Sequence, residues 1–253
     1  YLKSKINKFV FLSILITISM IDLWVIDLKL LDFSILKNEK FEENKDIANV
    51  IKNLEDNNTT ADIPFFRVNA AYYIKYTWNS YFGFEDIYGR TATISKDYLE
   101  YLGLAGVKQQ LYKFLNVKYT ILPKNYDFDK NLYSKIYENS EYQLLKNQEY
   151  LPRFFCIEKF EVLNNKDEIY DKLKKSDVCD TIYFLNSDLI ENNINIEKYK
   201  ENKITDAKLK IEAYRNSYIK LIIDTPTPKL LFASIKFSND WKIYNNNQKI
   251  KPL

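Results

Sequence analysis

In the last quarter of the chain apolar and polar residues alternate with period two, and this pattern constrains the fold more than any other feature. It runs without a helical insert through four segments: AKLKIEAY, YIKLIIDT, LLFASIKF and WKIYNNNQKI. Alternation at this period puts the apolar side chains on one face of a strand. Turn residues separate or interrupt the segments at Asn216-Ser217, Pro226-Thr227-Pro228 and Asn245-Asn246-Asn247. The pattern predicts an antiparallel sheet over 205–253, as part of a β-sandwich.

Upstream of this region, helical and strand patterns succeed one another. Helices are predicted over 47–54, 95–104 and 165–176, and strands over 64–73, 117–122, 150–163 and 181–185. The stretch 186–204 is rich in Asn, Glu and Lys and marks a boundary. We therefore expect a mixed α/β layer domain over 32–190 and an α+β fold class for the chain.

The N-terminus carries a long apolar run. Residues 9–21 are thirteen positions without a charge, Asp22 interrupts, and apolar residues continue to Ile26. Eighteen helical residues are about 27 Å long, just enough to cross a bilayer. Three lysines within residues 1–8 favour a cytoplasmic N-terminus. The pattern predicts a basic cytoplasmic flank over 1–8, a transmembrane helix over 9–31, and a chain that faces outward from the bacterial cytoplasmic membrane.

Two other interpretations of the apolar run stay open. A secretory signal peptide has the same order of charge and apolarity, but it needs small residues before its cleavage point. Residues 22–47 offer none, because the first Ala is Ala48. A buried core helix is the second alternative, since thirteen uncharged residues are few for a membrane span.

Composition excludes several classes of function. Lys and Arg number 37 against 34 Asp and Glu, so the net charge of +3 does not indicate a generally basic nucleic-acid binder. The chain has no His and two Cys, which excludes zinc sites built on His or paired Cys and nucleophilic triads built on His. Cys156 and Cys179 could form a bridge or stay free thiols, and both alternatives remain open.

The stretch 77–90, TWNSYFGFEDIYGR, is expected to be an irregular loop and the candidate binding site. Its aromatic side chains could stack on sugar rings, while its polar side chains could bind hydroxyl groups. The candidate substrate-binding residues are Trp78, Asn79, Tyr81, Asp86, Tyr88 and Arg90. The alternative is that the aromatic residues pack in a core and that Asp86 pairs with Arg90.

Carboxylate pairs such as Glu85-Asp86 do not indicate a catalytic centre. Adjacent residues point to opposite faces of a strand, and on a helix they diverge by about 100°. We therefore expect these pairs to lie on the solvated surface, and the sequence predicts no catalytic residue and no metal ligand.

Five segments in a particular order connect these features to a known family. They are the apolar helix that ends at Asp22 or Asp27, FFRV (65–68) with the stretch 78–90, LNVKYTIL (115–122), LPRFF (151–155), and LLFASIKFSNDWKIYNNNQKIKPL (230–253). Together they resemble the extracytoplasmic C-terminal region of the YfhO-type bacterial membrane proteins, which belong to the GT-C-like glycosyltransferase group. Asn239-Asp240 and Asn246-Asn247 depart from the family's Pro-Gly and Asp-Gly turns, but both pairs can still form turns.

The resemblance implies a part of a multi-span protein that transfers sugar from a polyprenyl-phosphate donor to an acceptor in the cell envelope. The family's catalytic acidic residues lie in a loop that this sequence does not contain, so no catalytic residue is carried over. The implied partners are the lipid bilayer and a lipid-linked sugar or envelope glycopolymer, without nucleic acid. No cofactor is expected in this chain, and a divalent metal would belong to the missing membrane part. We expect the chain to be a fragment, accessory to catalysis or acceptor binding.

A second functional class stays open beside the first. The chain could be a non-enzymatic, membrane-anchored module that binds an envelope carbohydrate. The two hypotheses differ in whether further membrane spans, with an acidic first outer loop, belong to the same polypeptide.

Overall fold

The computed structural model divides the chain into two compact units, residues 1–51 and 52–253. It describes residues 8–30, 44–55, 65–70, 74, 78–88, 95–175, 180–191, 193–196, 199, 207–215, 218–235, 241–246 and 248–250.

Two helices begin in the first unit. Helix α1 (Lys8–Leu30) exposes large apolar side chains, from Val10 at 51% to Leu23 at 62%. Helix α3 (Lys45–Glu55) is amphipathic and buries Ile47 and Ile51 completely. The helix predicted over 47–54 is therefore confirmed.

Among the described residues, no helix is both long enough and apolar enough to cross a bilayer. The segment predicted as a transmembrane helix over 9–31 is helical, but the prediction that it spans the membrane is not supported. Charged residues interrupt its apolar sequence: Asp22 and Asp27 follow the thirteen uncharged positions 9–21, and Lys29 lies near the helix end.

A five-stranded mixed sheet is the centre of the second unit. Its strand order is β2-β1-β3-β5-β4; β1 runs parallel to both β2 and β3, and the remaining pairs are antiparallel. Val117, Ile121 and Leu144 are completely buried, as their apolar character requires. The strands are β1 (Arg67–Asn69), β2 (Glu85–Asp86), β3 (Val117–Pro123), β4 (Tyr133–Glu138) and β5 (Tyr142–Asn147).

Helices contribute a second part of the core. Leu102, Leu111 and Leu173 come from three different helical elements and form a buried cluster with Val117 of the sheet. The helical elements are α4 (Trp78–Phe82), α5 (Lys96–Val107), the 3-10 helix η1 (Gln109–Leu115), α6 (Lys166–Lys175) and α7 (Asn186–Glu191). Helix α6 connects two further strands that pair in parallel, β7 (Phe160–Leu163) and β8 (Ile182–Leu185).

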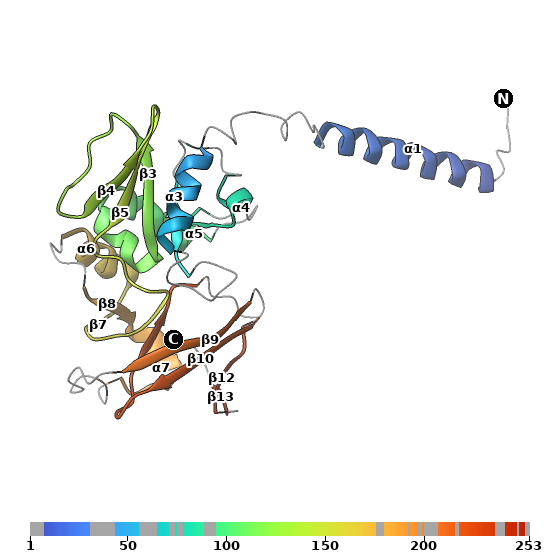
Figure 1. Cartoon of the computed structure of the whole chain (residues 1–253). Helices are drawn as coiled ribbons and strands as arrows, with labels where there is room; N and C mark the ends of the chain where they lie inside the picture. Colours follow the sequence, from blue (N-terminus) through green and yellow to red (C-terminus); the bar gives the residue numbers. More distant parts are fainter. Residues whose placement is uncertain are drawn as a thin grey trace. The chain divides into compact units, whose positions relative to one another are not determined.

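The C-terminal strands pair antiparallel, as the period-two pattern predicts, but in separate two-stranded sheets instead of the single sheet that was expected over 205–253. Strands β9 (Lys208–Arg215) and β10 (Tyr218–Asp224) form one antiparallel hairpin (Figure 1), and β12 (Ile243–Asn245) and β13 (Gln248–Ile250) form another. Strand β11 (Leu231–Ala233) instead pairs antiparallel with β6 (Phe154–Cys156) of the LPRFF segment. Antiparallel pairing is confirmed, whereas the β-sandwich stays a prediction.

The mixed α+β class is confirmed, with several small sheets instead of one large one. One hairpin was missed by the sequence analysis, and one local expectation needs correction. The hairpin of β4 and β5 was not predicted, and the stretch 77–90 is not wholly irregular, because it contains α4 and β2. The domain limits 32–190 and 205–253 stay a prediction.

Candidate functional site

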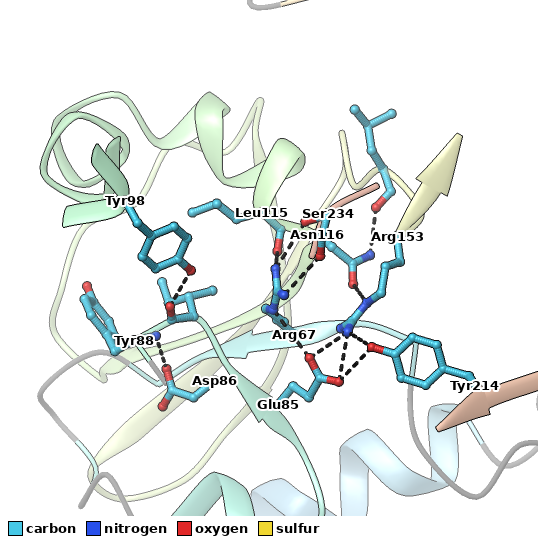
Figure 2. Close-up of polar contacts among 12 residues, drawn as sticks. Arg67, Glu85, Asp86, Tyr88, Tyr98, Leu115, Asn116, Arg153, Tyr214 and Ser234 are labelled. Carbon is cyan, nitrogen blue, oxygen red and sulfur yellow. Dashed lines mark hydrogen bonds and ion pairs between the residues drawn. The ribbon is translucent and has the colours of Figure 1, made fainter. Parts of the chain in front are cut away.

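Two charged residues on neighbouring strands start a buried polar network. Arg67 of β1 and Glu85 of β2 are register partners in the parallel pair (Figure 2). Register partners of parallel strands point to the same face of the sheet. The Nε atom of Arg67 lies 3.5 Å from Oε2 of Glu85, and the two side chains are 13% and 33% exposed. The pairing of two short strands therefore sets the position of this ion pair.

Arg153 adds a second guanidinium to the same carboxylate. Its Nη1 donates to both carboxylate oxygens of Glu85, at 2.8 and 2.7 Å, and also to the Tyr214 hydroxyl. The Tyr214 hydroxyl donates to Oε1 of Glu85 at 3.3 Å. Arg153 is 1% exposed, so this is a charge pair in a partly desolvated setting rather than a surface salt bridge. Tyr214 belongs to β9, and the network thus connects the hairpin to the sheet.

Asn116 fixes the orientation of the Arg153 side chain. It ends η1 in the left-handed conformation, with φ of 58°, which Asn adopts more readily than most residues. Its Oδ1 accepts a hydrogen bond from Nε of Arg153 at 3.1 Å. Its Nδ2 donates to the Tyr150 hydroxyl and to the carbonyl of Leu151, at 3.1 and 3.0 Å. The whole residue is buried, so these contacts satisfy its amide.

Ser234 connects both arginines to strand β11. Its backbone N–H donates to the carbonyl of Arg153 at 2.8 Å. Arg67 donates from Nη1 to Oγ of Ser234 at 3.1 Å and from Nη2 to its carbonyl at 3.0 Å, and also from Nη1 to the carbonyl of Leu115 at 3.0 Å. We call Arg67, Glu85, Asn116, Arg153, Tyr214 and Ser234 the arginine network.

The arginine network holds more positive than negative charge. Among the described residues, Glu85 is the one carboxylate that contacts either guanidinium. Burial and the neighbouring charge of Arg153 lower the pKa of Arg67, although Glu85 opposes this. Burial raises the pKa of the Tyr214 hydroxyl, which keeps it a neutral donor and acceptor.

The network draws a residue from each of the sequence landmarks that follow the apolar helix. Arg67 lies in FFRV, Glu85 in the stretch 78–90, Asn116 in LNVKYTIL, Arg153 in LPRFF and Ser234 in the segment 230–253. These segments are distant in sequence, yet one residue of each joins a single, partly buried network (Figure 2). The landmarks therefore share a structural role, which is to connect the mixed sheet to the C-terminal strands.

A pocket of about 730 Å³ borders the network at Arg153. Its described lining consists of residues 65, 150, 152–158 and 229, together with residues 207 and 209–211 around the start of β9. The lining includes the aromatic residues Phe65, Tyr150, Phe154 and Phe155. The volume lies within the range of sites for small organic ligands.

The residues expected to bind sugar differ in exposure to solvent. Trp78 and Asn79 are 1% and 2% exposed, and the Trp78 ring packs against Phe82 and Phe84 with centroid distances of 5.1 and 5.7 Å. Tyr81 in contrast is 63% exposed. The burial of Trp78 agrees with the alternative that the aromatic residues of this stretch pack in a core.

Polar contacts hold part of the predicted site together. Asn79 donates from Nδ2 to Oδ2 of Asp86 at 2.6 Å, and the Tyr88 backbone N–H donates to Oδ1 at 2.9 Å. Arg90 lies outside the described residues, so its predicted role and its pairing with Asp86 stay predictions. A sugar site on this stretch also stays a prediction, in which Tyr81 offers the exposed ring.

The expectation that Glu85-Asp86 is a solvated pair needs correction. The two side chains do diverge as adjacent strand residues should, but each is bound by protein donors. Glu85 is held by two arginines because β2 pairs with β1, a contact that sequence spacing does not reveal.

The described residues contain no group of three or more His, Cys, Asp or Glu side chains that could hold a metal ion. Cys156 is a free, half-buried thiol whose pKa is raised by burial, with the charge of Lys229 acting in the opposite direction. Cys179 lies outside the described residues. No known protein family, curated protein or solved structure matches the chain.

Analysis of the sequence missed the arginine network as a site, although one signal was present. Arg67 and Arg153 each stand inside an otherwise apolar segment, FFRV and LPRFF. A charged residue in such a segment is buried with its neighbours and requires a partner. The sequence did not reveal that this partner is Glu85, because the contact depends on the pairing of β2 with β1 in the tertiary structure.

Proposed function

We propose that the chain is an outward-facing accessory domain of a cell-envelope glycosyltransferase that uses a polyprenyl-phosphate sugar. In this proposal the domain holds or guides the acceptor, and catalysis belongs to membrane spans outside this sequence. The observation that carries the proposal is the arginine network, to which each landmark segment after the apolar helix contributes one residue. Because the network needs one residue from each segment, it explains why these segments occur together in one chain.

The proposal includes association with the bilayer through α1. The described side chains of this helix from Val10 to Leu23 are mostly large, apolar and about half exposed or more. Exposed apolar surface of this extent is unfavourable in water and favours a lipid or protein environment. The three lysines within residues 1–8 support the proposed orientation, in which the bulk of the chain lies on the outer side of the membrane.

Protease treatment of spheroplasts tests this location. The full chain is expressed in a bacterial host with an epitope tag after Leu253, and intact spheroplasts are treated with protease. We expect loss of the tag while a cytoplasmic marker stays intact. Protection of the tag until the membrane is lysed would place the domain inside and contradict the proposal.

Sugar transfer tests the enzymatic part of the proposal. Membranes from a strain with the intact gene and from a deletion strain are supplied with radiolabelled polyprenyl-phosphate sugars. We expect label to enter envelope polymer only when the gene is present. Equal incorporation in both membranes would instead favour the alternative, a membrane-anchored carbohydrate-binding module.

Mutation of the exposed Tyr81 tests the predicted sugar site without disturbing the packed core. Tyr81→Ala removes an exposed ring and should leave the fold intact, whereas Trp78→Ala would open the core. If the stretch 77–90 binds sugar, Tyr81→Ala weakens binding of envelope saccharides at least several-fold in a calorimetric titration. Unchanged affinity would remove this stretch from the proposal. The exposed Tyr126→Ala, on the loop between β3 and β4, is the matched control.

A further inference from the structure

Strands β6 and β9 lie near each other without pairing. Among the described residues, β6 pairs with β11 and β9 pairs with β10, each in a sheet of two strands. Side chains connect the two strands at Tyr214, whose hydroxyl accepts a hydrogen bond from Arg153 and whose ring lies 6.4 Å from the ring of Phe154 (Figure 2). Each strand therefore has one edge without a described partner strand.

The pocket beside Arg153 borders both of these strands. Its lining includes the three consecutive residues of β6, Phe154–Cys156, and the consecutive residues 209–211 of β9. Successive residues of a strand point to opposite faces, so a pocket on one face touches alternate residues, whereas a pocket along an edge touches consecutive ones. The ring of Phe155 stacks on Phe232 of β11 at 4.9 Å, away from the Phe154 ring beside Tyr214. The pocket therefore follows the edges of β6 and β9.

The edge of a strand can bind an extended peptide. Unpaired N–H and C=O groups along an edge form hydrogen bonds with the main chain of an added strand. In such complexes the main chain provides affinity, and pockets for alternate side chains provide specificity. Phe154, Ile157, Leu209 and Ile211 contribute apolar surface to the lining for these side chains.

Two exposed charges in the lining indicate the charge pattern of the occupant. Lys210 lies in β9 and Glu158 follows β6 by two residues, and both side chains line the pocket and are exposed. Within the described part of the chain, neither forms a hydrogen bond or an ion pair. A peptide with an acidic residue beside Lys210 and a basic residue beside Glu158 would pair both charges, with the modest gain that exposed ion pairs provide.

We propose that this pocket binds an extended segment of a partner protein as an additional strand between β6 and β9. The segment has alternate apolar side chains, with one acidic and one basic residue among the polar positions. Its main chain would join the β11-β6 and β9-β10 pairs into one continuous sheet. This inference goes beyond the proposed function and does not rest on it.

Calorimetric titration of the full, detergent-solubilised chain with two designed peptides tests the inference. The peptides are acetyl-KVTVEVT-amide and acetyl-EVTVKVT-amide, which carry the basic and the acidic residue in opposite order and so serve both possible strand directions. We expect at least one to bind with a Kd below about 1 mM, and the other to bind about three-fold more weakly or worse. Absence of binding by both peptides overturns the inference. Equal binding by both overturns the charge pattern.

Alternate N-methylation distinguishes strand pairing from other modes of binding. Successive N–H groups of an extended peptide point to opposite edges, so methylation of odd or of even positions blocks one edge at a time. Each methylated form of the tighter peptide should bind about ten-fold more weakly, because it loses the hydrogen bonds to one of the two strands. A methylated form that binds as tightly as its parent contradicts pairing with both strands.

Amide hydrogen exchange locates the bound peptide. The amides of β6 and of the first half of β9 should gain protection on binding, whereas those of β12 and β13 should not. Protection that is equal in the β12-β13 hairpin, or that is missing from β6 or from β9, overturns the site.

A charge reversal provides a second assignment. Lys210→Glu should weaken binding of the tighter peptide about three-fold or more, and replacement of the peptide's Glu by Lys should restore it. Lys249→Glu, the same change on β13 outside the lining, is the matched control and should have no effect. Equal weakening by both variants would show non-specific charge attraction and contradict the assignment.

Discussion

The five-stranded sheet and the β9-β10 hairpin both have apolar residues in strands, but only the sheet buries them completely. Val117, Ile121 and Leu144 are 0% exposed, whereas every residue of β9 and β10 is at least partly exposed. The sheet is stabilised by packing, and helices α5 and α6 help to cover its core. Polar contacts through Tyr214 hold the hairpin to the sheet. Regular alternation thus predicts strand pairing, but burial depends on what packs against the strands.

The largest expected effect is on the sheet core. Leu144→Ala creates a cavity at a fully buried position and should lower the free energy of unfolding by about 3–4 kcal/mol. Leu231→Ala, the same change at a 38% exposed position of β11, should lower it by less than about 1 kcal/mol. Urea denaturation measures both. Equal losses would mean that the sheet and the C-terminal strands are stabilised in the same way.

The second prediction concerns the polar connection. Arg153→Met removes the charge that Glu85 and Asn116 bind, and should lower the free energy of unfolding by about 2–3 kcal/mol, since Glu85 is one-third exposed. Amide hydrogen exchange should show lost protection in β9 and β11 before β3 and β5. Uniform loss of protection across all four strands would contradict a local role for the network.

A smaller effect is expected from one hydroxyl. Tyr214→Phe removes the hydrogen bonds to Arg153 and Glu85 but keeps the ring that packs edge-on against Phe65. The expected loss is about 1 kcal/mol, the usual contribution of an intramolecular hydrogen bond. Tyr218→Phe in β10, at 54% exposure, is the control and should change nothing measurable in urea denaturation. A larger loss of stability for Tyr218→Phe than for Tyr214→Phe would show that the Tyr214 hydroxyl does not hold the hairpin to the sheet.

The smallest effect comes from an ion pair outside the network. The Nζ atom of Lys113 lies 2.6 Å from Oδ1 of Asp180, and their hydrogen bond lowers the pKa of Asp180 despite partial burial. Asp180 is 47% exposed, so Asp180→Asn should lower the free energy of unfolding by only about 0.5 kcal/mol at pH 7.

The pH dependence of this pair has a defined sign. The carboxylate pKa is lower in the folded state, so its contribution is complete above the ordinary value of 3.8 and disappears as the pH falls through the folded pKa. The difference between wild type and Asp180→Asn should vanish in urea titrations at pH 2 to 3. A difference that persists there would show that a neutral side chain makes the contact.

The sequence predicts much of the local structure. Helix α6, strands β3 and β8, and the hairpin whose turn contains Asn246 follow from periodicity and turn residues. The sequence analysis did not predict the β4-β5 hairpin, although both strands are present in the structure. Helix α1 forms, but a helical apolar segment with Asp22 and Asp27 does not by itself establish a membrane span.

The candidate sites show where prediction from sequence ends. The stretch 77–90 is conspicuous because it concentrates aromatic and polar residues, yet Trp78 is buried. The pocket beside Arg153 depends on LPRFF lying next to β9, which begins 55 residues after Arg153.

The sequence by itself determined elements with regular periodicity, such as α6, β3 and β8, and that Arg67 and Arg153 stand in apolar segments. Tertiary structure decided that both guanidiniums share Glu85, and that one of them borders a pocket. The reason is that secondary structure follows from contacts a few residues apart, whereas the partner of a buried charge is fixed by strands that meet from distant parts of the chain.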